Sequence, residues 1–133
     1  MLRYFDEKLQ KGIDFVELFL SDDKSVKKIA LELIATSEKK QIRDRYSAEI
    51  LYYLIRAHYA NCSRRKTLIR DGLVPDNIRE EMFELQLLQK YSYDEKDEVV
   101  EVGYLLISQI GYDIIEEVLG GILKSCVYPQ GGG

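Results

Sequence analysis

The sequence predicts a mainly α-helical fold with one small β-hairpin, within a single domain that covers residues 1–133. Three observations lead to this prediction. Apolar residues recur at three- and four-residue intervals along most of the chain, which is typical of amphipathic helices. A Gly-Leu-x-Pro break at residues 72–75 separates two of these segments. After Lys90 the pattern changes to tyrosine- and valine-rich arms around an acidic turn, which predicts a hairpin.

Composition is that of a globular protein. The 133 residues are 46% hydrophobic and 32% charged, enough to form a core without disulfides or metals. No apolar run approaches the roughly 20 residues that span a bilayer, and the start, MLRYFDEKLQ, lacks the order of a signal peptide. We therefore expect a cytoplasmic protein without membrane contact. Cys62 and Cys126 lack metal-type spacing and are expected to be thiols.

Residues 1–38 are predicted to form an N-terminal extension of two helices. The first helix is expected from Leu2 to Leu20, with Gly12 weakening it. Its apolar stripe consists of Leu2, Phe5, Leu9, Ile13, Val16 and Leu20. Ser21–Asp23 supplies an N-cap for the second helix. The buried face of that helix is expected to hold Val26, Ile29, Ala30, Leu33 and Ile34, and the opposite face Lys24, Lys27 and Lys28.

A core with a closing helix is predicted over residues 44–124. Its first helix runs from about Asp44 to Tyr59 and places five residues on one side: Tyr46, Ile50, Tyr53, Leu54 and Ala57. Ser63 is the expected cap of a short helix over residues 64–70, which Asp71-Gly72 ends because glycine accepts a left-handed backbone.

The next helix is expected to start after Pro75, which restricts Val74 to an extended backbone. Either Asp76 or Asn77 can cap it, and Asn77 with Glu80 has capping-box spacing. Its inward side chains are Ile78, Met82, Leu85 and Leu88, so the helix is predicted to reach about Lys90.

Beyond Lys90, residues 91–93 are expected to pair with the valine-rich arm across the turn DEKDE. A last helix, YDIIEEVLGGILKSC, is predicted to bury Ile114, Ile115, Val118, Leu119 and Ile122. The pair Gly120-Gly121 is expected to bend this helix or to allow a close helix crossing. Residues 127–133 form a tail that we expect to be frayed.

From about residue 47 to 120, this order of elements resembles a winged helix-turn-helix domain. The stretch SAEILYYLIRA suits the first core helix, and IRDGLVPDNIREEMFELQLLQKYSY looks like the turn, the recognition helix and the first wing strand. VGYLLISQIGYDIIEEVL is similar to the second wing strand, a Ser-x-x-Gly break and the closing helix. The match is one of pattern and covers about 75 of the 133 residues.

The resemblance implies binding of double-stranded DNA, usually in transcriptional regulation, with the helix near Asp76 in the major groove. At its start, Arg79 suits a guanine and Asn77 an adenine. Four carboxylates nearby would be repelled by phosphates. The turn DEKDE also departs from the family pattern, which usually places Arg or Lys in the wing. Contact of the wing with DNA is therefore in doubt.

Charge is unevenly distributed along the chain. Residues 39–70 carry nine Lys or Arg against two acids, while residues 71–133 carry four against thirteen. The basic residues suit phosphate contacts that position a protein without reading sequence. They are Arg64, Arg65, Lys66, Arg70, Lys39, Lys40, Arg43 and Arg45. Two alternatives stay open: the basic and acidic regions neutralise each other across the fold, or the SRRK stretch pairs with acids of the wing or of a partner subunit.

No residue pattern predicts an enzyme, a metal site or a cofactor. His58 is the single histidine and is expected to be structural. The N-terminal helices exceed a minimal winged helix, and together with the last helix they are expected to form a homodimer. Two functions from different classes follow. One is a dimeric DNA-binding regulator, and the other is a winged-helix protein-interaction module or assembly subunit that does not bind nucleic acid directly.

Overall fold

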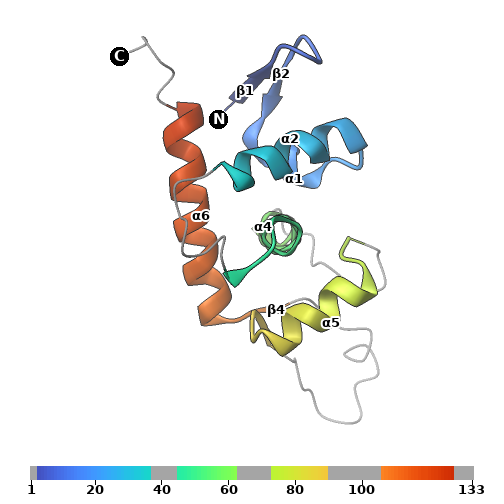
Figure 1. The fold of residues 1–133 in the computed structure, drawn as a ribbon, viewed down its shortest axis with the longest axis vertical. Helices are drawn as coiled ribbons and strands as arrows, with labels where there is room; N and C mark the ends of the chain where they lie inside the picture. Colours follow the sequence, from blue (N-terminus) through green and yellow to red (C-terminus); the bar gives the residue numbers. More distant parts are fainter. Residues whose placement is uncertain (1–2, 37–44, 63–72, 90–105, 128–133) are drawn as a thin grey trace. The chain divides into compact units, whose positions relative to one another are not determined.

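The computed structural model describes residues 3–36, 45–62, 73–89 and 106–127. The described part is mainly helical with a small antiparallel strand pair after α5, as the sequence predicts, and it includes a second antiparallel pair that was not predicted (Figure 1). In chain order its elements are β1 (Arg3–Asp6), β2 (Lys11–Asp14), α1 (Phe15–Leu20), α2 (Lys24–Ala35), α4 (Ala48–Cys62), α5 (Asp76–Glu84), β3 (Leu88–Gln89), β4 (Leu106–Ile107) and α6 (Gln109–Val127).

The chain divides into two compact units. The first unit comprises Met1–Tyr52 together with Glu116–Gly133, and the second comprises Tyr53–Ile115. The division falls inside α4 and inside α6, so each of these helices contributes residues to both units.

The first unit begins with a β-hairpin where we predicted a helix over residues 2–20. Strands β1 and β2 pair antiparallel, with Tyr4 opposite Ile13 and Phe5 opposite Gly12. Ile13 is buried, whereas the Phe5 residue is 63% exposed. The prediction of a helix is therefore wrong for residues 3–14. The apolar residues of this segment lie three and four positions apart, which fits a helix. The segment instead forms strands, whose side chains alternate between two faces, and Phe5 lies on the exposed face.

The turn of this hairpin explains why the chain reverses. Gln10 has a left-handed backbone with φ of 51°, and its N–H donates to the carbonyl of Glu7 at 3.2 Å. Across the strands, Arg3 Nε lies 3.5 Å from Asp14 Oδ1. A Cβ at Gly12 would lie 3.5 Å from Arg3 Nε, an ordinary van der Waals distance, so the arginine side chain packs over this glycine.

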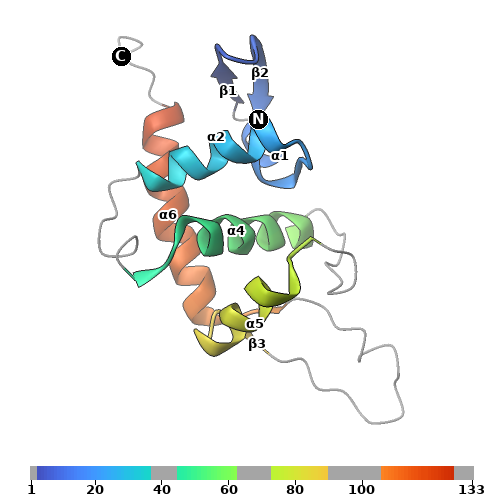
Figure 2. The same cartoon turned by 45° about the vertical axis from the view of Figure 1, so that its right-hand side comes forward.

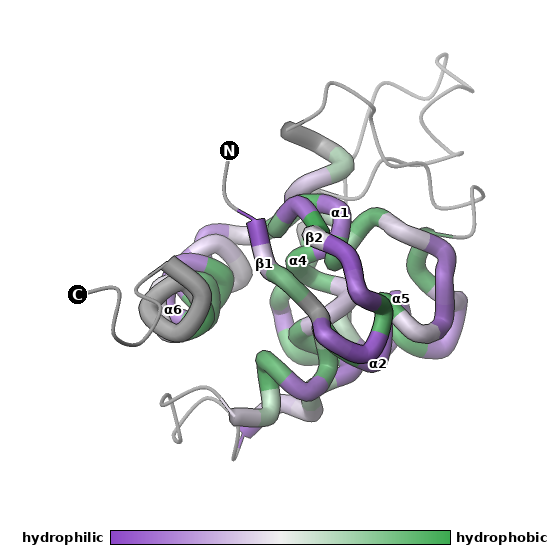
Figure 3. The backbone as a smooth tube through the Cα atoms, turned by 90° about the horizontal axis from the view of Figure 1, so that it is seen from above, coloured by the Kyte–Doolittle hydropathy of each residue, from purple (hydrophilic) through white to green (hydrophobic). Residues whose placement is uncertain are grey.

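Helix α2 starts where its cap predicts. Asp23 is the N-cap and its carboxylate accepts a 2.8 Å hydrogen bond from the Ser25 N–H, which satisfies one free donor of the first turn. The Asp23 N–H in turn donates to Ser21 Oγ at 3.0 Å. Hydropathy alternates along α2 in Figure 3, as an amphipathic helix requires. Of the predicted inward residues, Val26, Ile29, Ala30 and Ile34 are buried and Leu33 is partly exposed.

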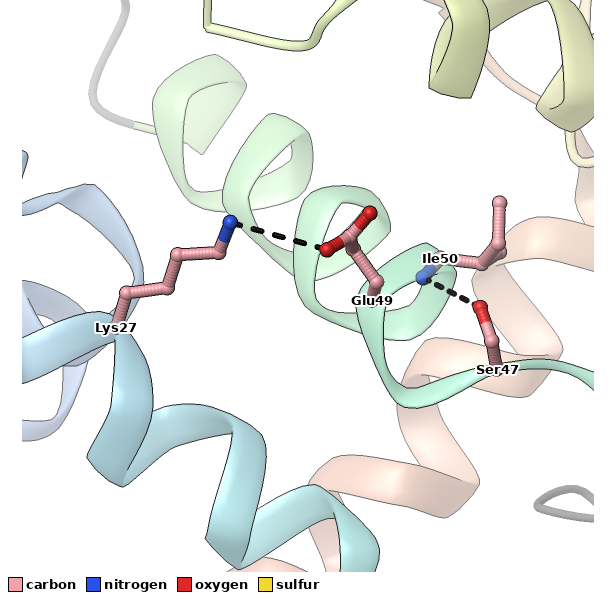
Figure 4. A network of polar contacts seen from close by, with 4 residues as sticks. All are labelled: Lys27, Ser47, Glu49 and Ile50. Atoms are coloured by element: carbon pink, nitrogen blue, oxygen red, sulfur yellow. Dashed lines mark hydrogen bonds and ion pairs between the residues drawn. The ribbon is translucent and has the colours of Figure 1, made fainter. Parts of the chain in front are cut away.

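Helix α4 begins at Ala48, four residues later than we predicted. The Oγ of Ser47 accepts a 3.2 Å hydrogen bond from the Ile50 N–H, so this serine caps the helix (Figure 4). In the same picture Lys27 of α2 reaches Glu49 of α4, with Nζ 4.0 Å from Oε2.

Aromatic rings join the helices of the first unit. The ring centroids of Phe15 and Phe19 are 5.7 Å apart at an interplanar angle of 61°, and that of Tyr52 lies 5.9 Å from Phe19. All three residues are buried, and edge-on or tilted pairs of this kind are the favoured arrangement of aromatic rings. This cluster packs α1 against the start of α4.

Helix α5 ends at Glu84, whereas we predicted that it reaches Lys90. Gln86 has a left-handed backbone with φ of 63° and its N–H donates to Phe83 O, while the Leu87 N–H donates to Met82 O. These two bonds form a Schellman motif, which normally favours glycine at the left-handed position. The sequence has no glycine there, so the stop signal was missed.

The predicted hairpin is described only at its base. Strands β3 and β4 pair antiparallel with Leu88 opposite Ile107 and Gln89 opposite Leu106. The change from helix to strand therefore comes before Lys90, and not after it. The arms and turn at residues 90–105 lie outside the described residues, as do the predicted helix at 64–70 and the tail at 128–133.

Helix α6 buries four of its five predicted residues. Ile114, Ile115, Val118 and Ile122 are buried, and Leu119 is partly exposed. A Cβ at Gly120 would meet nothing within 4 Å among the described residues. Of the two expectations for the glycine pair, a bend or a close helix crossing, the crossing is not seen at Gly120 within the described part of the chain.

Candidate interaction surface on α5

In the second unit, an arginine of α4 is hydrogen-bonded to the segment that precedes α5. Arg56 is only 5% exposed, and its Nε donates a 3.1 Å hydrogen bond to the carbonyl oxygen of Leu73. Val74 follows and is buried. Pro75 is the N-cap with an extended backbone at ψ of 148°, so the chain enters α5 directly after a turn that Arg56 anchors.

The capping prediction for α5 is wrong. Pro75, and neither Asp76 nor Asn77, is the N-cap, and no side chain caps this end. Asp76 lies in the first turn of the helix and accepts a 3.0 Å hydrogen bond from Arg79 Nη1. The Arg79 side chain is 19% exposed and that of Asp76 is 83% exposed. The guanidinium predicted to contact a guanine is thus held against the side of its own helix.

The outward side of α5 is acidic. Apart from Asn77, its exposed side chains are carboxylates, a set that we call the acidic α5 face: Asp76, Glu80, Glu81 and Glu84. The opposite side is apolar, with Ile78 at 6% and Met82 at 0% exposure. Burial of these two side chains fixes the rotation of the helix, so the carboxylates have to point outward.

Hydrogen bonds from the start of α6 fix the far end of α5. Ser108 Oγ donates to the carbonyl oxygen of Gln86 at 2.6 Å, and the Ser108 N–H donates to Leu87 O at 3.0 Å. The Gly111 N–H donates back to Ser108 Oγ at 3.0 Å, which is an N-cap bond for α6. A Cβ at Gly111 would lie 2.5 Å from Leu87 O. The Ser-x-x-Gly sequence therefore lets α6 approach the backbone at the end of α5.

The predicted nucleic-acid contacts are only partly described. Asn77 is exposed on α5, and Arg79 is ion-paired there. Arg45 is exposed in the first unit, with its guanidinium carbon 5.4 Å from the ring centroid of Tyr46. The other predicted residues lie outside the described part of the chain: Lys39, Lys40, Arg43, Arg64, Arg65, Lys66 and Arg70.

Sequence reasoning missed two features of this surface. Arg56 belongs to the basic residues of 39–70, but in the structure it is buried and its Nε donates a hydrogen bond to the Leu73 carbonyl. A signal was present, because Arg56 lies between Ile55 and Ala57 on an otherwise apolar stretch of α4. The second missed feature is the left-handed backbone of Gln86, which no local sequence signal indicates.

His58 lies half-buried between two tyrosine rings of the second unit. Its ring centroid is 5.3 Å from that of Tyr59 and 5.8 Å from that of Tyr112, the latter edge-on at 86°. Burial lowers the pKa of His58 below the ordinary value of 6.5, because the charged imidazolium loses hydration there. These contacts pack the imidazole against aromatic rings, and the structural role of His58 stays a prediction.

Within the described residues, no group of three or more His, Cys, Asp or Glu side chains is placed to hold a metal ion. None of the described helices combines the length and the apolar character needed to span a bilayer. Comparison with protein-family models, with curated proteins and with solved structures found no match to this chain. The winged-helix resemblance therefore remains one of element order.

Proposed function

We propose that this protein is a winged-helix interaction module whose acidic α5 face binds a positively charged segment of a partner protein. The order helix, helix, strand, strand, helix from α4 to α6 supports the winged-helix part of the proposal. The observation that carries the binding part is the ion pair of Arg79 with Asp76, beside exposed Glu80, Glu81 and Glu84. In a winged-helix domain, the helix at the position of α5 contacts DNA. Here the only cation of α5, Arg79, is already paired with Asp76, so the exposed side of the helix offers none to a phosphate.

Electrostatics favours a basic partner over a nucleic acid at this surface. Carboxylates brought near the phosphates of a duplex raise the free energy of binding, because like charges repel and no counterions are released in compensation. The same carboxylates attract lysine and arginine side chains, and complementary charge accelerates encounter and selects the partner. Asp76 is 83% exposed, so its carboxylate remains accessible while it holds Arg79.

A dimeric DNA-binding regulator is the second candidate. Asn77 favours it, because this exposed side chain lies in the first turn of α5 and a carboxamide can pair with adenine in the major groove. The basic residues 39–70 would supply the phosphate contacts in that case. A homodimer through the N-terminal and C-terminal helices belongs to this candidate.

The two candidates are separated by binding measurements with a lysine-rich peptide and with a DNA duplex of about two helical turns. Amide NMR spectra of the full chain should show peptide-induced shifts along α5 that saturate. A triple variant, E80Q/E81Q/E84Q, should weaken peptide binding about tenfold or more, since each lost charge pair contributes to affinity. The matched control E7Q/E116Q/E117Q removes the same number of exposed carboxylates elsewhere and should bind nearly as well as the natural protein.

DNA binding that falls steeply with salt, and that an Arg64/Arg65/Lys66 triple-alanine form abolishes, would instead establish the regulator. If both glutamine variants weakened peptide binding equally, binding would depend on the net charge of the protein and not on the acidic α5 face, which would contradict the proposal.

A further inference from the structure

The hairpin of the first unit presents a strand edge. Within the residues that the structure describes, β1 and β2 form a two-stranded sheet, so the other edge of β1 carries no strand there. Figure 2 shows this hairpin beside the helices α1 and α2. Backbone N–H and C=O groups along such an edge are a template for a further strand, and a two-stranded sheet becomes more stable when strands are added.

The exposed face of β1 carries an aromatic ring between two opposite charges. Side chains alternate along a strand, so Arg3, Phe5 and Glu7 share one face, and all three are exposed. Phe5, at 63%, is more exposed than the other exposed large hydrophobic residues of the described part, Ile110 at 46% and Tyr112 at 42%. An exposed ring of this size in a strand favours a partner that covers it.

This order of side chains is self-complementary. If two copies of β1 pair antiparallel with Phe5 opposite Phe5, then Arg3 of each copy lies opposite Glu7 of the other. Side chains opposite each other in an antiparallel pair lie on the same face with Cβ atoms about 4.5–5.5 Å apart, so each guanidinium meets a carboxylate. Glu7 can take part because it is the first residue of the turn, whose carbonyl accepts from Gln10, and only the central residues of a turn leave the strand direction.

The existing contact of Arg3 is compatible with this pairing. Arg3 Nε lies 3.5 Å from Asp14 Oδ1, and the arginine side chain is 65% exposed. A guanidinium has five N–H donors, so Arg3 can contact Asp14 of its own hairpin and Glu7 of a second copy.

Charge also permits two hairpins to approach each other. Residues 3–14 carry three cations and three carboxylates, whereas the whole chain has a net charge of −4. The hairpins therefore meet without net repulsion, although the chains as a whole repel weakly.

The edge of β2 lacks these features. Gly12 is the residue opposite Phe5, so β2 has no side chain to bury at the corresponding position. Gln10, with φ of 51°, turns the chain away from the strand direction just before β2 begins. The side chains and the backbone thus both favour β1 as the edge that pairs.

We infer that β1 pairs antiparallel with β1 of a second copy of this chain, so that two hairpins form one continuous sheet with the Phe5 rings in contact at its centre. The interface differs from the expected homodimer through N-terminal and C-terminal helices. It lies in the first unit and does not involve the acidic α5 face of the second, so its test fails or succeeds separately from the proposed function. A short strand pair buries less than the about 1,000 Å² of a stable interface, so the dimer is weak and dissociates on dilution.

The first experiment is sedimentation velocity of the full chain between about 10 µM and about 1 mM, where the average mass should rise with concentration. Phe5→Thr keeps a strand-forming residue but removes both central rings, and it should weaken dimerisation about tenfold or more. Ile110→Thr is the matched control, because it removes an exposed apolar side chain outside the hairpin, and it should dimerise like the natural protein.

A charge exchange tests the register. E7R would place two guanidinium groups opposite each other in each pair and should weaken dimerisation about tenfold, whereas R3E/E7R restores opposite charges and should recover most of the affinity. E117R, on α6, changes the net charge as much as E7R does and should have little effect.

The natural protein decides the matter even where a variant fails to fold. In an equal mixture of isotope-labelled and unlabelled chains at about 1 mM, NMR contacts between copies should join the two Phe5 rings. A chain that stays monomeric at this concentration would overturn the inference. So would contacts between copies that omit β1, or a loss of dimer in E117R as large as that in E7R.

Discussion

Ser108 Oγ donates a hydrogen bond of 2.6 Å to the carbonyl oxygen of Gln86, the left-handed residue two positions beyond the last residue of α5. This bond joins two segments 22 residues apart in sequence and lies at the base of the β3–β4 pair. It ties the end of the proposed interaction helix to the start of α6.

Gly111 should be intolerant of a side chain. In Gly111→Ala the new Cβ would lie 2.5 Å from Leu87 O and 2.7 Å from Ile107 Cγ2, and the backbone oxygen cannot yield as a flexible side chain would. We expect a loss of about 1–3 kcal/mol in the free energy of unfolding, measured by urea denaturation. Gly120→Ala is the matched control in the same helix, where space is open, and it should gain about 0.5–1 kcal/mol. Equal effects at the two positions would contradict the close approach.

Gln86 should accept glycine with a gain in stability. Its φ of 63° strains a side-chain-bearing residue, and glycine adopts this conformation without that cost. Relief of the left-handed backbone, worth about 1–2 kcal/mol, exceeds the entropic cost of glycine, so we expect Gln86→Gly to raise the free energy of unfolding by about 0.5–1 kcal/mol. Glu84→Gly, two residues earlier and inside α5, should lower it by about 1 kcal/mol. A loss at both positions would show that α5 does not stop where the Schellman motif places its end.

Arg56 should be needed for stability in spite of its charge. Arg56→Met keeps much of the side-chain volume but leaves the Leu73 carbonyl without its 3.1 Å donor. A hydrogen bond from a charged donor contributes about 1.5–3 kcal/mol, and this partly buried one should appear as a loss of about that size in urea denaturation. Arg45→Met is the control, because Arg45 is exposed and its contact with the Tyr46 ring is worth only about 0.5–1 kcal/mol at such a site. A loss no larger than that of the control would mean that Arg56 does not anchor the turn before α5.

His58 should titrate below pH 6.5, because burial lowers its pKa in the folded chain. It is the only histidine, so its imidazole NMR signals are unambiguous. The unfolded chain takes up the proton more readily than the folded one. The stabilisation from neutral His58 is thus complete above the unfolded-state pKa and is lost as the pH falls through it towards the folded-state value.

Two readouts check this pH dependence. The folded-state titration midpoint should lie below 6.5. Between about pH 8 and about pH 5, the natural protein should lose more stability than His58→Gln, which carries no titrating group at this position. A midpoint at or above 6.5, or parallel losses in the two proteins, would be inconsistent with a desolvated His58.

The α2 and α6 segments were largely predictable because their signals are local. The Ser21–Asp23 cap lies next to the helix that it starts, and Asp23 accepts from Ser25 as expected. The apolar residues of α6 recur with the helical period, and four of the five are buried. A cap needs only neighbouring residues and a stripe needs only a period, so both can be recognised in sequence.

The candidate site was less predictable because its charges are paired or buried by the fold. From sequence, Arg79 and Arg56 are both cations that suit a polyanion. In the structure Arg79 is held by Asp76 and Arg56 by the backbone of Leu73. The first pairing spans one helical turn, whereas the second joins residues 17 apart and requires the turn before α5 to pack on α4.

By itself, the sequence determined a mainly helical chain, the capped start of α2, the apolar stripe of α6 and a strand pair after α5. Tertiary structure decided that residues 3–14 form a hairpin, with Phe5 outside and Ile13 inside. It also decided that α5 stops at Glu84. Just beyond that end, Ser108 and Gly111 contact the backbone of Gln86 and Leu87. A local pattern indicates the period of a helix or strand, but one pattern can fit more than one structure. Contacts between segments distant in sequence determine which of these structures forms.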